Sequence, residues 1–127
     1  MTSIDPILVI DDDEVLRSMI VEILTDEGYP VIGAADGAQG LKVALGSVLA
    51  LILLDMRMPN MNGWEFVKAY REQSGRPVPI VVCTAASNAS LWAEEVQADG
   101  FLAKPFGLEE LLSTVHHFVS GAGVSAV

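Results

Sequence analysis

Residues 7–13 read ILVIDDD and residues 51–55 read LILLD, so two short apolar runs each end on aspartate. Continuous apolar runs of this length are typical of strands that are buried on both faces, as in a parallel sheet. Three further apolar runs have the same character, at Val31-Ile32, Val78 to Val82 (with Pro79 inside it) and Phe101 to Ala103. The sequence therefore predicts five short strands.

Helical patterns lie between these runs. Apolar stripes with a helical period cover residues 15–24, 38–45, 64–70 and 108–119, with a short and ambiguous one at 91–96. Gly28 stands where the first helix is expected to end. The alternation of strand and helix predicts an α/β protein, a doubly wound five-stranded parallel sheet with helices on both faces.

Length and composition place the chain among single globular domains. It has 127 residues, of which 51% are hydrophobic, which is too apolar for intrinsic disorder. We expect one domain over residues 1–127, with its core at about 6–119 and a flexible tail at 121–127. The longest apolar run, Val48 to Leu54, is too short to cross a membrane, and no basic, apolar leader supports secretion.

Charge and cysteine content narrow the function classes. The net charge is −10, from 7 basic and 17 acidic residues, so this domain alone is not expected to bind nucleic acid. Cys83 is the single cysteine and cannot form an internal disulfide, which fits a reducing, cytoplasmic location.

Polar residues follow four of the five predicted strands: Asp11 to Asp13, Asp55, Thr84 and Lys104. In doubly wound folds the chemistry lies beyond the carboxyl ends of the strands, so these side chains are expected to converge. Carboxylates about 5 Å apart repel by roughly 3 kcal/mol at an effective dielectric near 20, which favours a bound cation. Mg²⁺ suits such an open site, with Asp11 and Asp12 as ligands and Asp13 as a helix cap.

Asp55 is the candidate for covalent chemistry. A carboxylate can attack phosphorus to give an aspartyl phosphate, and the added negative charge then needs neutralising. Lys104 offers a fixed positive charge and Thr84 a hydroxyl donor, which together with a metal ion would serve the phosphoryl oxygens.

Four motifs in order, LVIDDDE (8–14), LILLDMRMPNMNGWEF (51–66), VVCTA (81–85) and GFLAKPF (100–106), resemble the receiver domain of two-component response regulators, in particular stand-alone chemotaxis receivers. The resemblance implies a flavodoxin-like strand order 2-1-3-4-5. It implies that Asp55 is the phosphoacceptor, and that Asp11, Asp12, Asp55 and the backbone carbonyl of Arg57 bind Mg²⁺.

The same resemblance assigns the phosphoryl-binding and switch positions. Thr84 resembles the switch hydroxyl, Lys104 the phosphoryl-binding lysine, and Phe101 the aromatic residue that reports phosphorylation through the face formed by the fourth helix, fifth strand and fifth helix. The Lys104-Pro105 bond is expected to be cis. The implied donor is a histidine kinase or a histidine phosphotransfer protein, and the downstream protein is not identified by the sequence.

Some positions depart from the common receiver pattern. Asn62 replaces Asp and should still cap the third helix, whereas Gln97 replaces a glycine before the fifth strand. Phe101 replaces Tyr and has no hydroxyl to anchor it outside, so its inward orientation should be populated before phosphorylation as well. Arg57 and Ala86 are expected to tune the lifetime of the aspartyl phosphate, with Arg57 reaching over the phosphoryl group.

Three other interpretations of the sequence compete with the receiver interpretation. The stretch DDDEV at 11–15 also fits a haloacid-dehalogenase-like phosphatase with Asp11 as nucleophile, although the acidic pair that such an enzyme needs after Lys104 is missing. A flavin carrier needs a different first loop, because Asp11 to Glu14 would repel the FMN phosphate. A degenerate receiver would act only by binding proteins. We therefore expect a phosphoacceptor with self-catalysed phosphoryl transfer and autodephosphorylation, and no other enzyme activity. It could act alone or be part of a longer protein.

Overall fold

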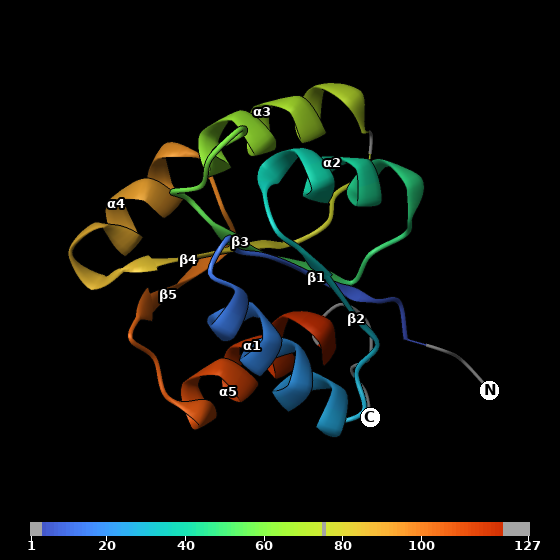
Figure 1. Cartoon of the computed structure of the whole chain (residues 1–127), viewed down its shortest axis with the longest axis vertical. Helices are drawn as coiled ribbons and strands as arrows, with labels where there is room; N and C mark the ends of the chain where they lie inside the picture. Colours follow the sequence, from blue (N-terminus) through green and yellow to red (C-terminus); the bar gives the residue numbers. More distant parts are fainter. Residues whose placement is uncertain (1–3, 75, 121–127) are drawn as a thin grey trace.

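The computed structural model describes residues 4–74 and 76–120 (Figure 1). The strands are β1 (Ile7–Ile10), β2 (Val31–Ala34), β3 (Leu51–Asp55), β4 (Ile80–Ala85) and β5 (Gly100–Lys104). The helices are α1 (Glu14–Asp26), α2 (Gly37–Gly46), α3 (Gly63–Gln73), α4 (Ala86–Glu95) and α5 (Leu108–Ser120). The flexible tail expected at 121–127 lies outside the described residues.

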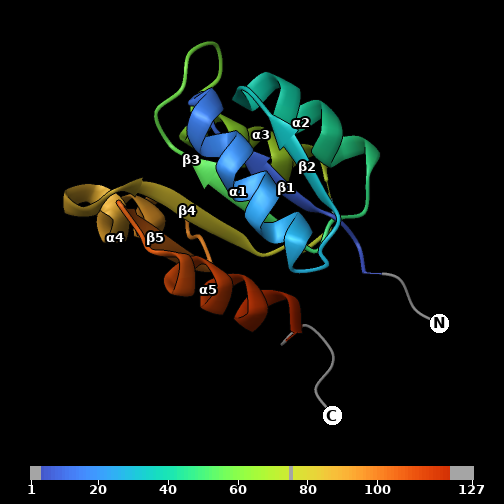
Figure 2. The same cartoon turned by 60° about the horizontal axis from the view of Figure 1, so that its bottom comes forward.

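The five strands form one parallel sheet in the order β2-β1-β3-β4-β5, which confirms the predicted fold. Helices α1 and α5 cover one face, and α2, α3 and α4 cover the other (Figures 1 and 2). Because every strand runs the same way, their carboxyl ends share one edge of the sheet.

Two hydrophobic clusters lie on the two faces of the sheet. The central strands β1 and β3 are buried over their whole length, and their side chains alternate between the clusters. From β3, Ile52 and Leu54 pack with Phe66 of α3, whereas Leu51 and Leu53 pack against α1 and α5. These two clusters fix the central strands and thereby the position of the residues that follow them.

Helices α1 and α3 have the caps that the sequence indicates. Asp13 caps α1 by accepting a hydrogen bond from the amide of Leu16, and Asn62 forms a capping box with Glu65 at the start of α3. Gly28 follows α1 with a φ of 98°, which a residue with a side chain rarely adopts.

Two predicted boundaries are wrong. The fourth strand covers Ile80–Ala85 rather than 78–82, so Thr84 lies inside the strand and not after it. Pro79 precedes the strand because it has no amide hydrogen for the sheet. Helix α4 begins at Ala86, five residues before its predicted start at 91, because its first turn is made of small residues with no apolar stripe.

Among the described residues, no helix has the length and apolar character needed to cross a membrane.

Candidate functional site

Three carboxylates gather where β1 and β3 end. Asp11 and Asp12 follow β1, Asp55 is the last residue of β3, and one oxygen of each lies within 4.8 Å of the others. Asp11 and Asp55 are buried, whereas Asp12 is exposed. The predicted convergence of these residues is therefore present in the fold.

Asp11 is held firmly by its neighbours. One carboxylate oxygen accepts a hydrogen bond from the amide of Asp13 at 2.9 Å, and the other accepts one from Nζ of Lys104 at 3.0 Å. Its backbone carbonyl accepts a further bond from the guanidinium of Arg17 at 2.7 Å. Since both oxygens of Asp11 already have partners, the exposed Asp12 carboxylate is the more available ligand for an incoming cation.

Lys104 brings the fifth strand into the site. It ends β5, and its Nζ lies 3.6 Å from Asp55 Oδ1, near its bond to Asp11. Burial works against the charged form, but the hydrogen bond to Asp11 and the two carboxylate charges outweigh it and raise the pKa of Lys104. The ammonium group therefore stays charged beside Asp55. The Lys104-Pro105 bond is cis, as expected.

The ionised form of Asp55 is destabilised by its surroundings. Burial and the negative charge of Asp11 raise its pKa to about 6, with Lys104 opposing the rise and Asp12 adding to it. A cation that binds beside Asp55 would stabilise its ionised form by offsetting the repulsion from Asp11 and Asp12.

The donor set fits a hard divalent ion. Mg²⁺ prefers oxygen ligands, one or two carboxylates and several waters, and the three converging carboxylates are partly open to solvent through Asp12. Burial and the charges of Asp11 and Asp12 raise the pKa of Asp55 although Lys104 opposes the rise, so a cation at the cluster would stabilise the ionised carboxylate. Asp12, Asp55 and the carbonyl of residue 57 would hold such an ion, and it would supply charge neutralisation for phosphoryl oxygens.

The loop after Asp55 is fixed by close packing. The amide of Gly63 donates to the carbonyl of Met56 at 2.9 Å, and a Cβ at Gly63 would come within 2.4 Å of the sulfur of Met56. Asn60 has a φ of 69° and donates to Asp36 at the start of α2. The loop therefore presents residue 57 in a defined place.

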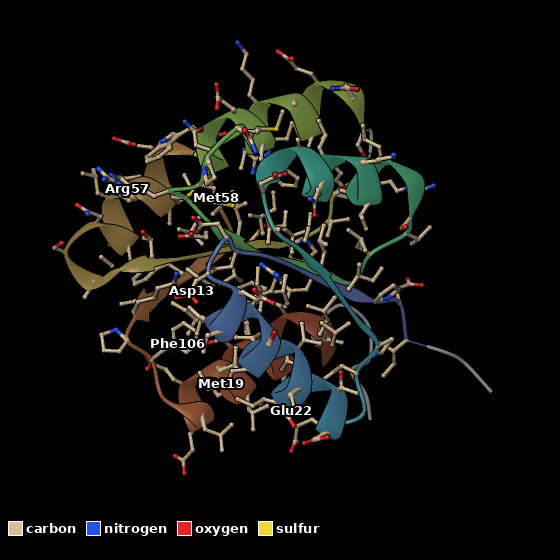
Figure 3. The ribbon with its side chains drawn as sticks, in the orientation of Figure 1. Asp13, Met19, Glu22, Arg57, Met58 and Phe106 are labelled. Atoms are coloured by element: carbon tan, nitrogen blue, oxygen red, sulfur yellow. The ribbon has the colours of Figure 1, made fainter. Side chains whose placement is uncertain are left out.

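The side chain of Arg57 lies against helix α4, and its expected role over the phosphoryl group stays a prediction. Its guanidinium carbon is 5.4 Å from the ring centre of Trp92 in α4, a cation–π distance, and the side chain is exposed (Figure 3). In this structure the guanidinium is thus engaged by α4. The sequence offered no signal for this contact, because residues 57 and 92 are distant along the chain.

Thr84 and Phe101 lie on the sheet face that α4 covers. Thr84 is buried in β4. Phe101 of β5 is paired with Val82, and Val82 lies two residues before Thr84, so the three side chains share one face of the sheet. Phe101 is 48% exposed in this structure, and the additional inward orientation that we expect stays a prediction. Ala86 is exposed at the start of α4.

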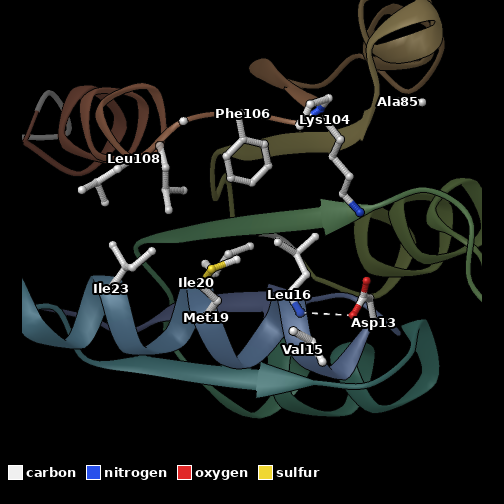
Figure 4. Close-up of a pocket in the computed structure, with 13 residues that line it drawn as sticks. Asp13, Val15, Leu16, Met19, Ile20, Ile23, Ala85, Lys104, Phe106 and Leu108 are labelled. Carbon is white, nitrogen blue, oxygen red and sulfur yellow. Dashed lines mark hydrogen bonds between the residues drawn. The ribbon is translucent and has the colours of Figure 1, made fainter.

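A groove of about 650 Å³ runs from the site between α1 and α5. Its mouth carries Asp13 and Lys104, and its walls are apolar, with Met19 of α1 facing Phe106 and Leu108 across it (Figure 4). The apolar stripe of α1 is only partly buried: Ile20 and Leu24 lie in the core. Val15 at 77% exposed and Met19 at 49% face the groove or solvent, because α5 lies beside α1 and does not cover this end of the stripe.

Fold and site together define a doubly wound domain with a buried carboxylate beside a lysine at the carboxyl edge of its sheet. The chain matches the model of the response regulator receiver domain over residues 7–116, and it belongs to that family. Receiver domains accept phosphoryl groups as their general function and act as signalling proteins, so the phosphatase and flavin-carrier readings are set aside.

Individual relatives agree with this assignment. The chain is 38% identical to the transcriptional regulatory protein CpxR of Escherichia coli K12 over 109 residues, which are 86% of this chain and 47% of that protein. This chain thus spans about half the length of that relative.

Solved structures extend the likeness to the fold. The chemotaxis response regulator CheY4 of Vibrio cholerae is 37% identical with a TM-score of 0.82, covering 91% of this chain and 99% of that one. The receiver domain of the sensor histidine kinase PA1611 of Pseudomonas aeruginosa, described with magnesium in its active-site cleft, is 33% identical with a TM-score of 0.81, covering 93% and 99%.

Proposed function

We propose that this receiver takes a phosphoryl group from a phosphohistidine onto Asp55 in the presence of Mg²⁺. The observation that carries the proposal is a buried carboxylate at the end of β3 with Lys104 Nζ at 3.6 Å and two further carboxylates beside it. This arrangement supplies a nucleophile, a fixed cation and a site for a divalent ion at one point.

Each residue has a distinct part in the transfer. An oxygen of Asp55 forms a bond to phosphorus while the bond from phosphorus to the donor imidazole breaks, and the bonding electrons leave with the imidazole nitrogen. Lys104 neutralises a phosphoryl oxygen, and Thr84 donates its hydroxyl to another. Asp11 holds Lys104 in place, and Asp12 would bind the Mg²⁺ ion that neutralises further phosphoryl charge. Hydrolysis by water then returns Asp55 to its free state.

Labelling by a small phosphodonor tests this proposal. Acetyl phosphate with Mg²⁺ should add one phosphoryl group to the intact protein, and peptide mapping should place it on Asp55. Asp55→Asn and excess EDTA should each abolish the labelling, and Asp12→Ala should raise the Mg²⁺ concentration that it requires. Labelling that persists in Asp55→Asn would disprove the assignment, and an unlabelled wild type would favour a degenerate receiver that acts by protein binding alone.

The groove between α1 and α5 is the surface we assign to the phosphodonor. It is continuous with the site through Asp13 and Lys104, and its exposed apolar side chains fit one helix of a histidine-bearing helical bundle. Met19→Glu should therefore slow transfer from a cognate donor protein but leave labelling by acetyl phosphate unchanged. Equal slowing with both donors would place the donor elsewhere.

The phosphorylated state is proposed to act through the face formed by α4, β5 and α5. Movement of the Thr84 hydroxyl toward the phosphoryl group would vacate space on the face of the sheet that Phe101 shares, and the ring could turn inward. Arg57 and Ala86 are proposed to set the phosphoryl lifetime. The downstream partner is a protein, and a cytoplasmic location is the one in which such a donor and partner would meet it.

A further inference from the structure

Arg57 and Trp92 connect the phosphoacceptor loop to helix α4. Arg57 comes two residues after Asp55, and its guanidinium lies over the indole ring of Trp92 at 5.4 Å. A guanidinium in this position is attracted by the negative face of the ring. Arg57 is the positively charged residue nearest to Asp55 in the sequence. Its guanidinium is therefore held by α4 when Asp55 carries no phosphoryl group.

The ring of Trp92 is itself fixed in place. Trp64 of α3 packs against it edge-on, with ring centres 4.9 Å apart and planes at 67°. The indole Nε1 of Trp64 donates a hydrogen bond to Glu95 of α4 at 2.9 Å, one turn beyond Trp92. Trp92 thus offers Arg57 a rigid surface, since its position is set from both α3 and α4.

We propose that Trp92 is a positioning residue for Arg57: it holds the guanidinium on α4 in the resting protein and competes with a phosphoryl group at Asp55 for it. The inference rests on the function proposed above. A phosphoryl group brings negative charge and acceptor oxygens, and charge-assisted hydrogen bonds from Arg are stronger than an exposed cation–π contact. Phosphorylation therefore draws Arg57 off the ring and removes one of the contacts between the loop and α4.

This competition predicts that loss of the Trp92 ring increases the affinity for a phosphoryl mimic. Beryllofluoride with Mg²⁺ occupies the phosphoryl position on the carboxylate, so Arg57 must leave Trp92 before it can contact the mimic. Trp92→Leu keeps an apolar side chain of some bulk but removes the aromatic face. It should tighten beryllofluoride binding by about two- to fivefold, which is the factor that an exposed cation–π contact represents.

A variant set separates this role from a structural one. Arg57→Ala should weaken mimic binding, and Trp92→Leu placed on top of Arg57→Ala should have no further effect, because Trp92 acts only through Arg57. Trp92→Phe keeps a ring face and should bind the mimic as the wild type does. Tightening by Trp92→Leu that is the same with and without Arg57 would overturn the inference.

Fluorescence reports the contact directly. In a Trp64→Phe background the remaining indole is Trp92, so its emission should change when beryllofluoride is added, and also when Arg57 is replaced by Ala without the mimic. Mimic binding with no change of Trp92 emission would contradict the inference. A wild type that binds no beryllofluoride would instead contradict the proposed function, while the effect of Arg57→Ala on resting emission would still report the contact.

Discussion

Helices α4 and α5 flank the same strand, β5, but they are attached to the sheet in different ways. Helix α5 buries Leu111 and Val115 completely in the cluster that it shares with α1. Helix α4 buries Ala89 and Ala93, which are small side chains that displace little water. The completely buried side chains of α5 are larger than the alanines of α4, so we expect α4 to be the less firmly anchored of the two helices.

The ends of α4 support the same distinction. Its N-cap is Ala85, which has no side-chain oxygen for the free amides of the first turn. The carbonyls of Val96, the C-cap of α4, and of the next residue Gln97 accept hydrogen bonds from the guanidinium of Arg71 in α3. Long side chains from α3 and the phosphoacceptor loop thus fix α4. Such contacts can be exchanged without opening the core, and this suits a helix two residues after Thr84.

The largest expected difference concerns core substitutions. Leu111→Ala removes a buried side chain from the cluster under α5 and should lower the free energy of unfolding by about 2–4 kcal/mol. Ala89→Gly, the matched change in α4, should cost only about 1 kcal/mol from helix propensity. Urea unfolding of both variants measures this. Similar losses would mean that α4 is anchored as firmly as α5.

The next largest effect is a change in the free energy of unfolding that arises from the carboxylate cluster around Asp55 and not from either helix. The pKa of Asp55 is about 6 in the folded protein, against about 3.9 in an unfolded chain. The folded state therefore binds the proton more tightly, and stability of the metal-free protein falls as pH rises from about 4 to 6. Asp55→Asn should be more stable than wild type by about 1–2 kcal/mol near pH 7.5, a value reduced for solvent near the site.

Denaturation in EDTA at several pH values checks this prediction. The advantage of Asp55→Asn should shrink toward pH 4 and should also shrink when Mg²⁺ is added to the wild type. An advantage that is independent of pH would assign it to packing and not to charge.

Removing the tie at the end of α4 should have a smaller effect. Arg71→Met keeps the aliphatic stem but removes the two hydrogen bonds to the carbonyls of Val96 and Gln97, at an expected cost of about 1 kcal/mol. Amide hydrogen exchange should accelerate in α4 and stay unchanged around Leu111 in α5. Uniform acceleration across both helices would contradict local anchoring.

The smallest effect is expected at Gln97. Its φ of 55° places it in the left-handed region that glycine adopts more easily, so Gln97→Gly should stabilise the protein by about 0.5 kcal/mol. The reciprocal change, Gly28→Gln after α1 at a φ of 98°, should destabilise by about 1 kcal/mol. Thermal unfolding of the pair measures both signs. A loss of stability in Gln97→Gly would show that its side chain makes a larger contribution than the strain.

The parts of the structure that follow from local pattern could be predicted from the sequence. Apolar runs ending on Asp11, Asp55 and Lys104 placed these groups at one edge, because parallel strands must align their carboxyl ends. Caps such as Asn62 depend on neighbours within one turn and were equally readable.

The rest depends on contacts between distant residues. The first turn of α4 has no apolar period, so its start at Ala86 was missed. The position of Arg57 over Trp92 depends on how α3 sets the indole ring, and no local pattern encodes it. Gln97 was recognised as a departure from a common glycine, and it adopts the left-handed backbone conformation that favours glycine, while its carbonyl accepts a hydrogen bond from Arg71.

Amide hydrogen exchange with and without beryllofluoride and Mg²⁺ tests the central claim most directly, namely that a phosphoryl group at Asp55 shifts α4 while α5 stays fixed. We expect altered exchange in the loop after Asp55, at Thr84 and throughout α4, with the buried turn around Leu111 and Val115 unchanged. Asp55→Asn should show none of these changes. Bound mimic with exchange altered only in the pocket, or altered equally in α4 and α5, would contradict the account.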